Sequence, residues 1–197
     1  MATGVRKLDA IVLAAGAGRR FGGSKLSTDL GGGPLLDGAL AAAFAAPVRT
    51  VTVVWGADGR VLEVASRWAS RNRQVERLRL VHAADHAEGM AASLRAGVAA
   101  LPPRSAGVFV FLGDMPRVPH DLAARLAQTL DTAAWAAAPQ CGGVRGHPVL
   151  FTAKLYPTLA SQTGDRGAGR LLAALGDDLA LVETRDDGVL FDVDERP

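Results

Sequence analysis

The sequence predicts an α/β fold, a single Rossmann-like domain whose mostly parallel sheet is covered by helices on both faces. Short apolar runs rich in β-branched residues alternate with longer segments of helical periodicity, a pattern typical of right-handed βαβ units. Of the 197 residues, 49% are hydrophobic, so residues 1–197 can form one domain around a sizeable core. No linker or internal repeat divides the sequence.

The predicted strands are short and apolar. The first covers residues 10–14 and leads directly into a glycine-rich segment, and the strand predicted over 107–112 is apolar throughout. The remaining strands are predicted over 50–55, 78–81, 135–138, 149–151, 179–183 and 189–193.

The predicted helices lie between these strands. A helix over 60–70 places Val61, Val64 and Trp68 on one face, which is the pattern of a helix packed on a sheet. The remaining helices are predicted over 35–46, 90–101, 121–130, 153–160 and 169–175.

Charge and cysteine content exclude several classes of protein. The chain has 22 basic and 20 acidic residues, and its arginine cluster between residues 67 and 79 lacks the interleaved aromatic residues typical of nucleic-acid binding. Cys141 is the single cysteine, which excludes an intramolecular disulfide. No apolar run reaches the roughly 18 residues needed to span a bilayer. We therefore expect a cytoplasmic protein that binds neither nucleic acid nor membrane.

The N-terminal segment has the outline of a secretion signal, because Arg6 and Lys7 precede an apolar run over 10–17. However, Asp9 interrupts the junction, and Arg19 and Arg20 follow where a cleavage site would lie. A buried strand that enters a glycine-rich turn explains the segment more simply.

In a mostly parallel sheet, ligands bind beyond the carboxyl ends of the strands, where the strand order reverses. The segments that follow the predicted strands are therefore where a site is expected. These segments are residues 13–25, 55–59, 82–93 and 112–116.

The loop over residues 15–33 contains seven glycines but matches neither of two common nucleotide motifs. Arg19, Arg20 and Phe21 would crowd the helix packing of a dinucleotide fingerprint, and no hydroxyl residue follows Lys25 as a Walker loop requires. Glycines nevertheless let backbone N–H groups point at an anion, and the three basic side chains add positive charge. The pattern favours a polyphosphate site; the alternative is a flexible surface loop with solvated arginines.

Two groups of acidic residues could bind a metal ion: one follows a predicted strand, and the other lies near the end of the sequence. Asp114 comes directly after the apolar strand over 107–112, where it could cap a turn or bind Mg²⁺ together with substrate phosphates. Asp192 and Asp194 are two residues apart, so on a strand both would point to one face; they could be polar edge residues, or either could supply a second carboxylate.

His82 and His86 have the four-residue spacing that would suit a metal on a helix. They are predicted to follow a strand and cross into a loop, so the sequence gives little support to a zinc site.

Seven segments, in order, resemble the MobA-like nucleotidyltransferases and cover nearly the whole chain. They are LAAGAGRRFG with KL (residues 13–22 and 25–26), GPLL (33–36), GMAASLRAG (89–97), LGDMP (112–116), RGHPVLF (145–151), GDRGA (164–168) and DVD (192–194). Within the family, the sequence is most similar to the molybdenum cofactor cytidylyltransferases. The resemblance implies a fold of the nucleotide-diphospho-sugar transferase type.

The resemblance also implies a reaction. A phosphate on the molybdenum (molybdopterin) cofactor attacks the α-phosphate of CTP, which transfers CMP to the cofactor and releases pyrophosphate, with Mg²⁺ bound. The residues matching the family's catalytic positions are Arg19, Lys25 and Asp114. The residues that match the family's nucleotide contacts are Leu13, Ala14, Ala15, Gly16, Lys25, Ala83 and Ser93. The resemblance assigns His147 to the second substrate, and Asp114 and Asp194 to the metal. A molybdoenzyme that accepts the product is the implied protein partner.

Two details concern the substrates. In the family, LAAG accompanies cytidine nucleotides and LAGG guanine nucleotides, and this chain has Ala15, whose methyl group would fill space needed by a purine. Gly33 and Gly169 depart from the family pattern, which commonly has a larger, often basic residue and an arginine there. These departures concern the second substrate more than nucleotide transfer.

Three alternatives stay open on the sequence. The chain could transfer a guanylyl group to the same cofactor, or a cytidylyl group to another phosphorylated small molecule. It could also be a nucleotide-binding chaperone that delivers the cofactor without turnover, although a carrier would not need all of Arg19, Lys25 and Asp114.

Overall fold

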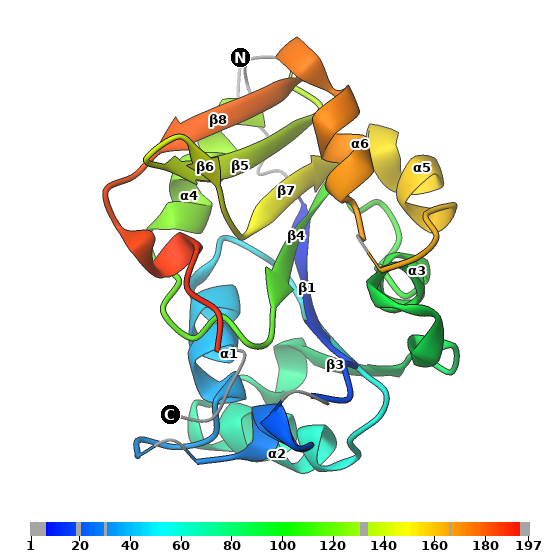
Figure 1. The fold of residues 1–197 in the computed structure, drawn as a ribbon, viewed down its shortest axis with the longest axis vertical. Coiled ribbons are helices and arrows are strands. Elements are labelled where there is room, and N and C mark those ends of the chain that lie inside the picture. Colours follow the sequence, from blue (N-terminus) through cyan, green and yellow to red (C-terminus); the bar gives the residue numbers. More distant parts are fainter. Residues whose placement is uncertain (1–6, 19–20, 30, 131–133, 166, 194–197) are drawn as a thin grey trace.

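The computed structural model describes residues 7–18, 21–29, 31–130, 134–165 and 167–193. Its centre is one eight-stranded sheet with the order β3-β2-β1-β4-β7-β5-β6, in which β8 pairs with β5 (Figure 1). The strands are β1 Leu8–Ala14, β2 Val51–Trp55, β3 Leu78–His82, β4 Gly107–Leu112, β5 Ala136–Cys141, β6 Val144–Arg145, β7 Val149–Thr152 and β8 Leu179–Glu183.

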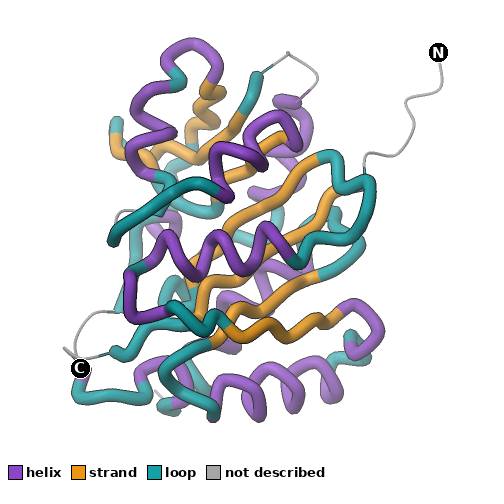
Figure 2. The backbone as a smooth tube through the Cα atoms, turned by 90° about the vertical axis from the view of Figure 1, so that its right-hand side faces the viewer, coloured by secondary structure: helices purple, strands orange, loops and turns teal. Residues whose placement is uncertain are grey.

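The described residues form six α-helices, which cover the two faces of this sheet (Figures 1 and 2). They are α1 Leu36–Ala45, α2 Arg60–Arg71, α3 Met90–Ala99, α4 Leu122–Thr129, α5 Tyr156–Ala160 and α6 Gly169–Ala174. Buried side chains of α1, α2 and α4 form one core with the sheet, whereas those of α3, α5 and α6 form a second core on the opposite face. The predicted α/β fold, with helices on both faces, is confirmed.

The strands divide the sheet into two regions. From β3 to β4 all neighbouring strands are parallel, with Ala10 opposite Val51 and Phe109, for example. β7 then runs antiparallel to both β4 and β5, and only β8 restores a parallel pairing. The sheet is therefore mixed, although mostly parallel where the chain begins.

Side-chain alternation along the strands explains the two cores. In β1, Ala10 and Val12 point into the first core and Ile11 into the second, all completely buried. Helix α2 follows the predicted pattern, with Val61, Val64 and Trp68 buried. No helix in the described ranges is long and apolar enough to cross a membrane.

The predicted strand over 189–193 is wrong. Asp186 caps a 3₁₀ turn, Asp187–Val189, by accepting a hydrogen bond from the Gly188 N–H at 2.8 Å. The chain then crosses two other segments: the Val189 carbonyl accepts from His147 N–H, and Val193 N–H donates to the Asp114 carbonyl. Isolated bonds to two segments replace the continuous ladder that a strand requires.

The amino-terminal end of the sheet contains a buried ion pair. Asp9 is fully buried on β1, and its carboxylate accepts hydrogen bonds from Arg49 Nη2 at 2.6 Å and Thr50 Oγ1 at 3.0 Å. A buried carboxylate that loses its cationic partner is left with an uncompensated charge. The pair therefore holds the residues just before β2 against the start of β1. This end of the two strands is opposite to the end that carries Ala14 and Trp55.

We predict that Arg49→Met lowers the free energy of unfolding by about 3 kcal/mol, because it leaves the Asp9 carboxylate buried without its cation. Urea denaturation measures this. The matched control is Arg60→Met, which removes the more exposed ion pair with Asp58 and is expected to cost less than about 1 kcal/mol. Equal losses in the two variants would contradict a special role for the buried pair.

Candidate functional site

A cleft of about 440 Å³ opens at the carboxyl ends of β1 and β4. This is where the strand order reverses, since β1 lies between β2 and β4, and it is where a ligand site was expected. The cleft is lined by Leu13, Ala14, Ala15, Gly16, Gly18, Lys25, Leu26, His86, Gly89, Met90, Ser93, Leu112, Asp114, Asp165 and Asp192. Of the four segments predicted to carry a site, only 55–59 contributes no lining residue.

The carboxyl ends of β1 and β4 are held side by side beyond the ladder itself. Gly113 N–H donates to the Leu13 carbonyl at 2.9 Å, and a Cβ at Gly113 would lie 3.0 Å from that same oxygen. Glycine therefore permits the close approach of the two strand ends. As a result, Asp114 emerges into the cleft directly beside Leu13 and Ala14.

The glycine-rich loop folds so that its lysine returns to the strand ends. The Gly18 carbonyl accepts hydrogen bonds from Phe21 and Gly23 N–H groups, with Gly18 itself at a φ of +58°. Ser24, also at positive φ, then leads into a 3₁₀ turn, Lys25–Ser27. A Cβ at Gly18 would approach Lys25 Cβ to 3.0 Å, so the tight turn and the position of Lys25 depend on each other.

Lys25 and Asp114 form an ion pair across the cleft. Lys25 Nζ lies 3.0 Å from Asp114 Oδ2, although the two residues are 89 positions apart in the chain. The Lys25 side chain is 10% exposed and that of Asp114 32%, so the cation is largely buried while the carboxylate faces the open cleft. Arg19 and Arg20, predicted to add charge here, lie outside the described residues.

The amino terminus of α3 forms another wall of the cleft. Gly89, Met90 and Ser93 line it, and Ala91 N–H donates to the Gly164 carbonyl at 3.1 Å. Gly89 has a φ of +110°, and a Cβ there would collide with Asp165 Oδ1 and the Gly164 backbone. The segment that carries Asp165 is therefore packed directly against the start of the helix.

Asp165 lines the cleft but was not among the predicted site residues. Asp165 belongs to one of the seven segments that resemble the family, but the sequence did not indicate that this segment lies at the cleft. Only the packing of Gly164 on α3 brings this carboxylate to residues that precede it by more than 70 positions.

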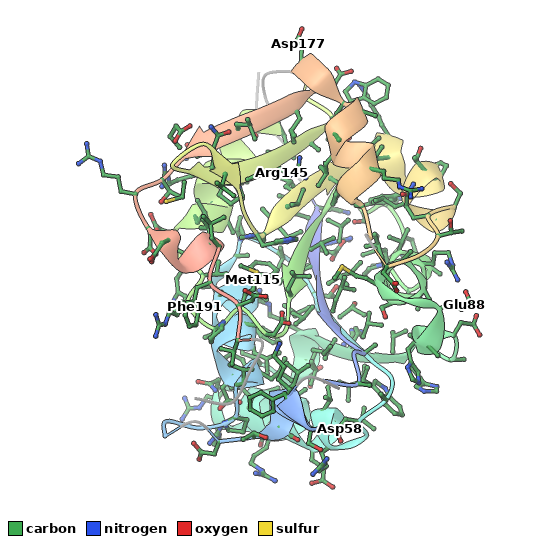
Figure 3. The ribbon with its side chains drawn as sticks, in the orientation of Figure 1. Asp58, Glu88, Met115, Arg145, Asp177 and Phe191 are labelled. Carbon is green, nitrogen blue, oxygen red and sulfur yellow. The ribbon has the colours of Figure 1, made fainter. Side chains whose placement is uncertain are left out.

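His147 lies beside the main cleft rather than in its lining. It borders two smaller cavities of about 130 Å³ and 200 Å³, which share Leu112, Arg145, Gly146 and His147. Burial lowers the pKa of His147, opposed by a hydrogen bond with the Val110 backbone and by the charge of Asp114. Its Nδ1 is buried with no hydrogen-bond partner among the described residues. Arg145, on β6, lies above the loop of Met115 in Figure 3.

The other predicted site residues are placed as follows. Ala83 is buried in the core, and its N–H donates to the Trp55 carbonyl, so its side chain does not line the cleft. The ring of His82 packs on that of Trp55 at a tilt of 35°, with ring centroids 4.3 Å apart, while His86 lines the cleft. Asp192 lines the cleft from an irregular segment, and Asp194 lies outside the described residues.

The described residues contain no cluster of three or more histidine, cysteine, aspartate or glutamate side chains that could hold a metal ion. Asp114 and Asp192 do line the same cleft, however, and the Val193 N–H bond to the Asp114 carbonyl holds their segments together. One or two carboxylates are the usual protein contribution to a Mg²⁺ site completed by substrate phosphates. The donor set is therefore suited to a cation that arrives with a phosphorylated ligand.

Two features meet at the point where the strand order reverses: a glycine-rich loop with an ion-paired lysine, and an aspartate at the end of a strand. Together they are typical of a nucleotide-binding α/β protein. Residues 10–179 match the model of the MobA-like NTP transferase domain, and the chain belongs to this family of nucleotidyltransferases. No curated protein matches the chain in sequence.

Solved structures share the fold over almost the whole chain. The Mycobacterium sp. strain JC1 homologue of Mycobacterium tuberculosis Rv0371c is 26% identical, with a TM-score of 0.76, over 95% of this chain and 90% of its own. Rv0371c from M. tuberculosis H37Rv, in complex with manganese, is 23% identical, with a TM-score of 0.70, over 90% and 88%. The 4-diphosphocytidyl-2C-methyl-D-erythritol synthase of Anaerococcus prevotii is 16% identical, with a TM-score of 0.75, over 96% and 91%. The fold is thus that of nucleotide-diphospho-sugar transferases.

We predict that Gly89→Ala lowers the melting temperature by several degrees and weakens nucleotide binding by about tenfold or more. The new methyl group would collide with Asp165 and Gly164, and alanine rarely adopts the positive φ of this position. Thermal unfolding and titration calorimetry with CTP measure the two effects.

Gly59→Ala is the control, since a Cβ at Gly59 meets nothing within 4 Å and its φ is −63°. If Gly89→Ala behaved like this control, the packing of the Asp165 segment on α3 would not shape the cleft.

Proposed function

We propose that this protein is a Mg²⁺-dependent cytidylyltransferase that transfers CMP from CTP to the phosphate of the molybdenum (molybdopterin) cofactor and releases pyrophosphate. The family supplies the reaction class, and the observation that carries the assignment of roles is the Lys25–Asp114 pair at the floor of the cleft. We also propose that residues 1–197 act as one domain, since residues 10–179 match the family and one sheet runs from residue 8 to residue 183.

Lys25 is proposed to bind the triphosphate. Its ammonium group lies at the strand ends beneath the glycine-rich loop, and Gly16 and Gly18 line the same part of the cleft. Asp114 compensates the charge of Lys25, and a bound α-phosphate would offer Lys25 a further anionic partner. Arg19, from the same loop, is proposed to share this role on the basis of the sequence.

Asp114 is proposed to hold Mg²⁺ together with the phosphates of the nucleotide. A bound Mg²⁺ would supply Lewis-acid and template chemistry at the phosphate oxygens. Asp192 is the described candidate for a second carboxylate, and Asp194 remains a proposal from the sequence. The manganese complex of Rv0371c is consistent with a divalent cation in this fold.

The reaction needs positioning and charge compensation rather than a protein nucleophile. An oxygen of the acceptor phosphate forms a bond to the α-phosphorus of CTP, while the bond from that phosphorus to the α,β-bridging oxygen breaks. Pyrophosphate leaves with the electron pair of the broken bond. Lys25 is placed to compensate the charge that develops around the α-phosphorus, which is the contribution expected of a positioned cation in phosphoryl transfer.

Leu13, Ala14, Ala15, Gly16 and Ser93 are proposed to contact the nucleotide, since all of them line the cleft. Ala83 is proposed to act, if at all, through its backbone, because its side chain is buried in the core. The methyl group of Ala15 supports CTP over GTP as the donor.

The acceptor is proposed to bind in the cavities beside His147. The 130 Å³ cavity shares Leu13, Met90 and Leu112 with the main cleft, so a ligand there would border the nucleotide. His147 Nδ1 is buried and unpartnered among the described residues, and buried polar atoms normally find a hydrogen-bond partner. A heterocycle with N–H or O–H groups, such as a pterin, is the acceptor proposed for these cavities. A molybdoenzyme that receives the finished cofactor completes the proposed partners.

The function is tested by pyrophosphate release with Mg²⁺ and molybdopterin-type cofactor, comparing CTP, GTP, ATP and UTP. Release with CTP alone is the expected result. Release with GTP alone would contradict the base assignment and favour guanylyl transfer. Nucleotide binding without release from any of the four would contradict the acceptor, and would favour another phosphorylated acceptor or a non-catalytic cofactor chaperone.

We predict that Asp114→Ala lowers the rate of pyrophosphate release at least 100-fold while the fold stays intact, because it removes the carboxylate that positions metal and phosphates. Steady-state kinetics measure the rate, and circular dichroism checks the fold. Asp177→Ala is the control: Asp177 is exposed on the 3₁₀ turn Gly176–Asp178, far from the cleft at the top of the molecule in Figure 3. Full activity of Asp114→Ala in Mg²⁺ would refute the metal assignment.

A further inference from the structure

One wall of the cleft is formed by His86, for which neither the family resemblance nor the proposed mechanism provides a role. His86 begins a 3₁₀ turn, His86–Glu88, just after β3, and its side chain is partly buried. It lines the cleft together with Ala15 and Ser93, two residues proposed to contact the nucleotide.

The position of His86 is fixed by close packing on Gly56, the residue that follows β2. A Cβ at Gly56 would lie 2.7 Å from both Cβ and Cγ of His86 and 2.9 Å from Cδ2, so the imidazole rests directly on the Gly56 backbone. Two hydrogen bonds add to this, from His86 N–H to the Ala83 carbonyl at 3.1 Å and from Gly89 N–H to the His86 carbonyl at 3.3 Å. These contacts hold the His86 ring in a fixed position in the lining of the cleft.

The geometry of the sheet indicates which part of a nucleotide lies near His86. The phosphate end is set by Lys25 and Asp114 at the ends of β1 and β4. His86 follows β3, which is two strands away from β1, a distance of about 10 Å at the usual strand spacing. A nucleotide whose triphosphate lies at Lys25 and which extends along the cleft therefore places its ribose and base, not its phosphates, at His86.

Ala15 lies on the same side of the cleft. Ala57 N–H donates to the Ala15 carbonyl at 3.2 Å, which brings Ala15 next to the Gly56 backbone that carries the His86 ring. Ala15 and His86 thus flank one short stretch of backbone after β2. The two side chains together leave less space for a base than the Ala15 methyl group alone would leave.

The imidazole can both stack on a base and hydrogen-bond to it. No hydrogen bond from the ring nitrogens of His86 to another described residue is present, so these nitrogens can serve a ligand. An aromatic side chain that is held rigidly also offers a stacking face at little entropic cost.

We propose that His86 contacts the nucleobase of the bound nucleoside triphosphate and, with Ala15, restricts the site to a pyrimidine. The inference rests on the nucleotide half of the proposed function and is independent of the acceptor. It makes His86 a residue that sets base specificity, with no part in the chemistry at phosphorus.

The test is titration calorimetry with Mg²⁺ on the full chain, with CTP, GTP and inorganic triphosphate as three separate probes. His86→Ala is expected to weaken CTP binding about tenfold and to reduce the preference for CTP over GTP, while triphosphate binds as in the wild type. His86→Phe keeps an aromatic face for stacking but loses the ring nitrogens, so it is expected to retain part of the CTP affinity. Because phenylalanine also fills the space of His86, this variant controls for a change in the shape of the cleft in His86→Ala.

His82→Ala is the matched control, since His82 lies four residues earlier and its ring packs on Trp55 outside the cleft lining. It should change CTP binding less than twofold. An unchanged CTP affinity in His86→Ala, an equal loss for CTP and triphosphate, or a wild-type preference for GTP would each overturn the proposal. Because binding is measured without acceptor, tight CTP binding without pyrophosphate release would refute the cytidylyl transfer and leave the role of His86 standing.

Discussion

The ion pair between Lys25 and Asp114 is the interaction on which the arrangement of the cleft depends. It joins the glycine-rich loop to the end of β4, a strand whose residues are all buried except Leu112. Without a partner, an ammonium group that is only 10% exposed would carry a large desolvation cost. The pair thus stabilises the loop in the position at which it faces a ligand. Because Asp114 remains one-third exposed, the same carboxylate stays accessible to a cation.

Three segments that are distant in sequence meet around this pair, and each is held by a few backbone hydrogen bonds. The loop after β4 is tied to β1 through Gly113 and Leu13, and the C-terminal segment is tied to Asp114 through Val193. The segment of Asp165 is tied to α3 through Gly164. Glycines permit these approaches where a side chain would collide, at Gly89 above all. The cleft is consequently a property of the closed fold rather than of any single motif.

The sequence predicted the regular elements well because their signals are local. Apolar β-branched runs and one-sided helices gave β1, β2, β4 and α2 to within a few residues, since strand and helix periodicity need no knowledge of the partner. The antiparallel insertion of β7 between β4 and β5 could not be seen, because pairing direction depends on the tertiary path.

The same limit explains the errors and omissions at the site. Residues 189–193 are apolar enough for a strand, but the Asp186 turn and the separate bonds to His147 and Asp114 determine their path. Asp165 and His86 reach the cleft through contacts with Gly89 and Gly56, and a sequence pattern does not reveal such contacts. The positions of Lys25 and Asp114 in the cleft, by contrast, could be predicted, because Lys25 belongs to the glycine-rich loop and Asp114 follows the strand over 107–112.

The two regions of the sheet carry separate spaces, and under the proposed function each space takes one of the two substrates. The parallel strands β3, β2, β1 and β4 carry the cleft, whereas β6 and β7, in the antiparallel region, carry Arg145 and Val149, which line the cavity beside His147. Leu13, Met90 and Leu112 are shared by both spaces and form the boundary where donor and acceptor would meet. Gly169, one of the departures from the family pattern, lines the second space only. Under the proposed function, glycine in place of an arginine there removes a cation from the acceptor side and leaves the nucleotide side unaltered. Variation within this fold can therefore change the acceptor while the machinery for nucleotide transfer is retained.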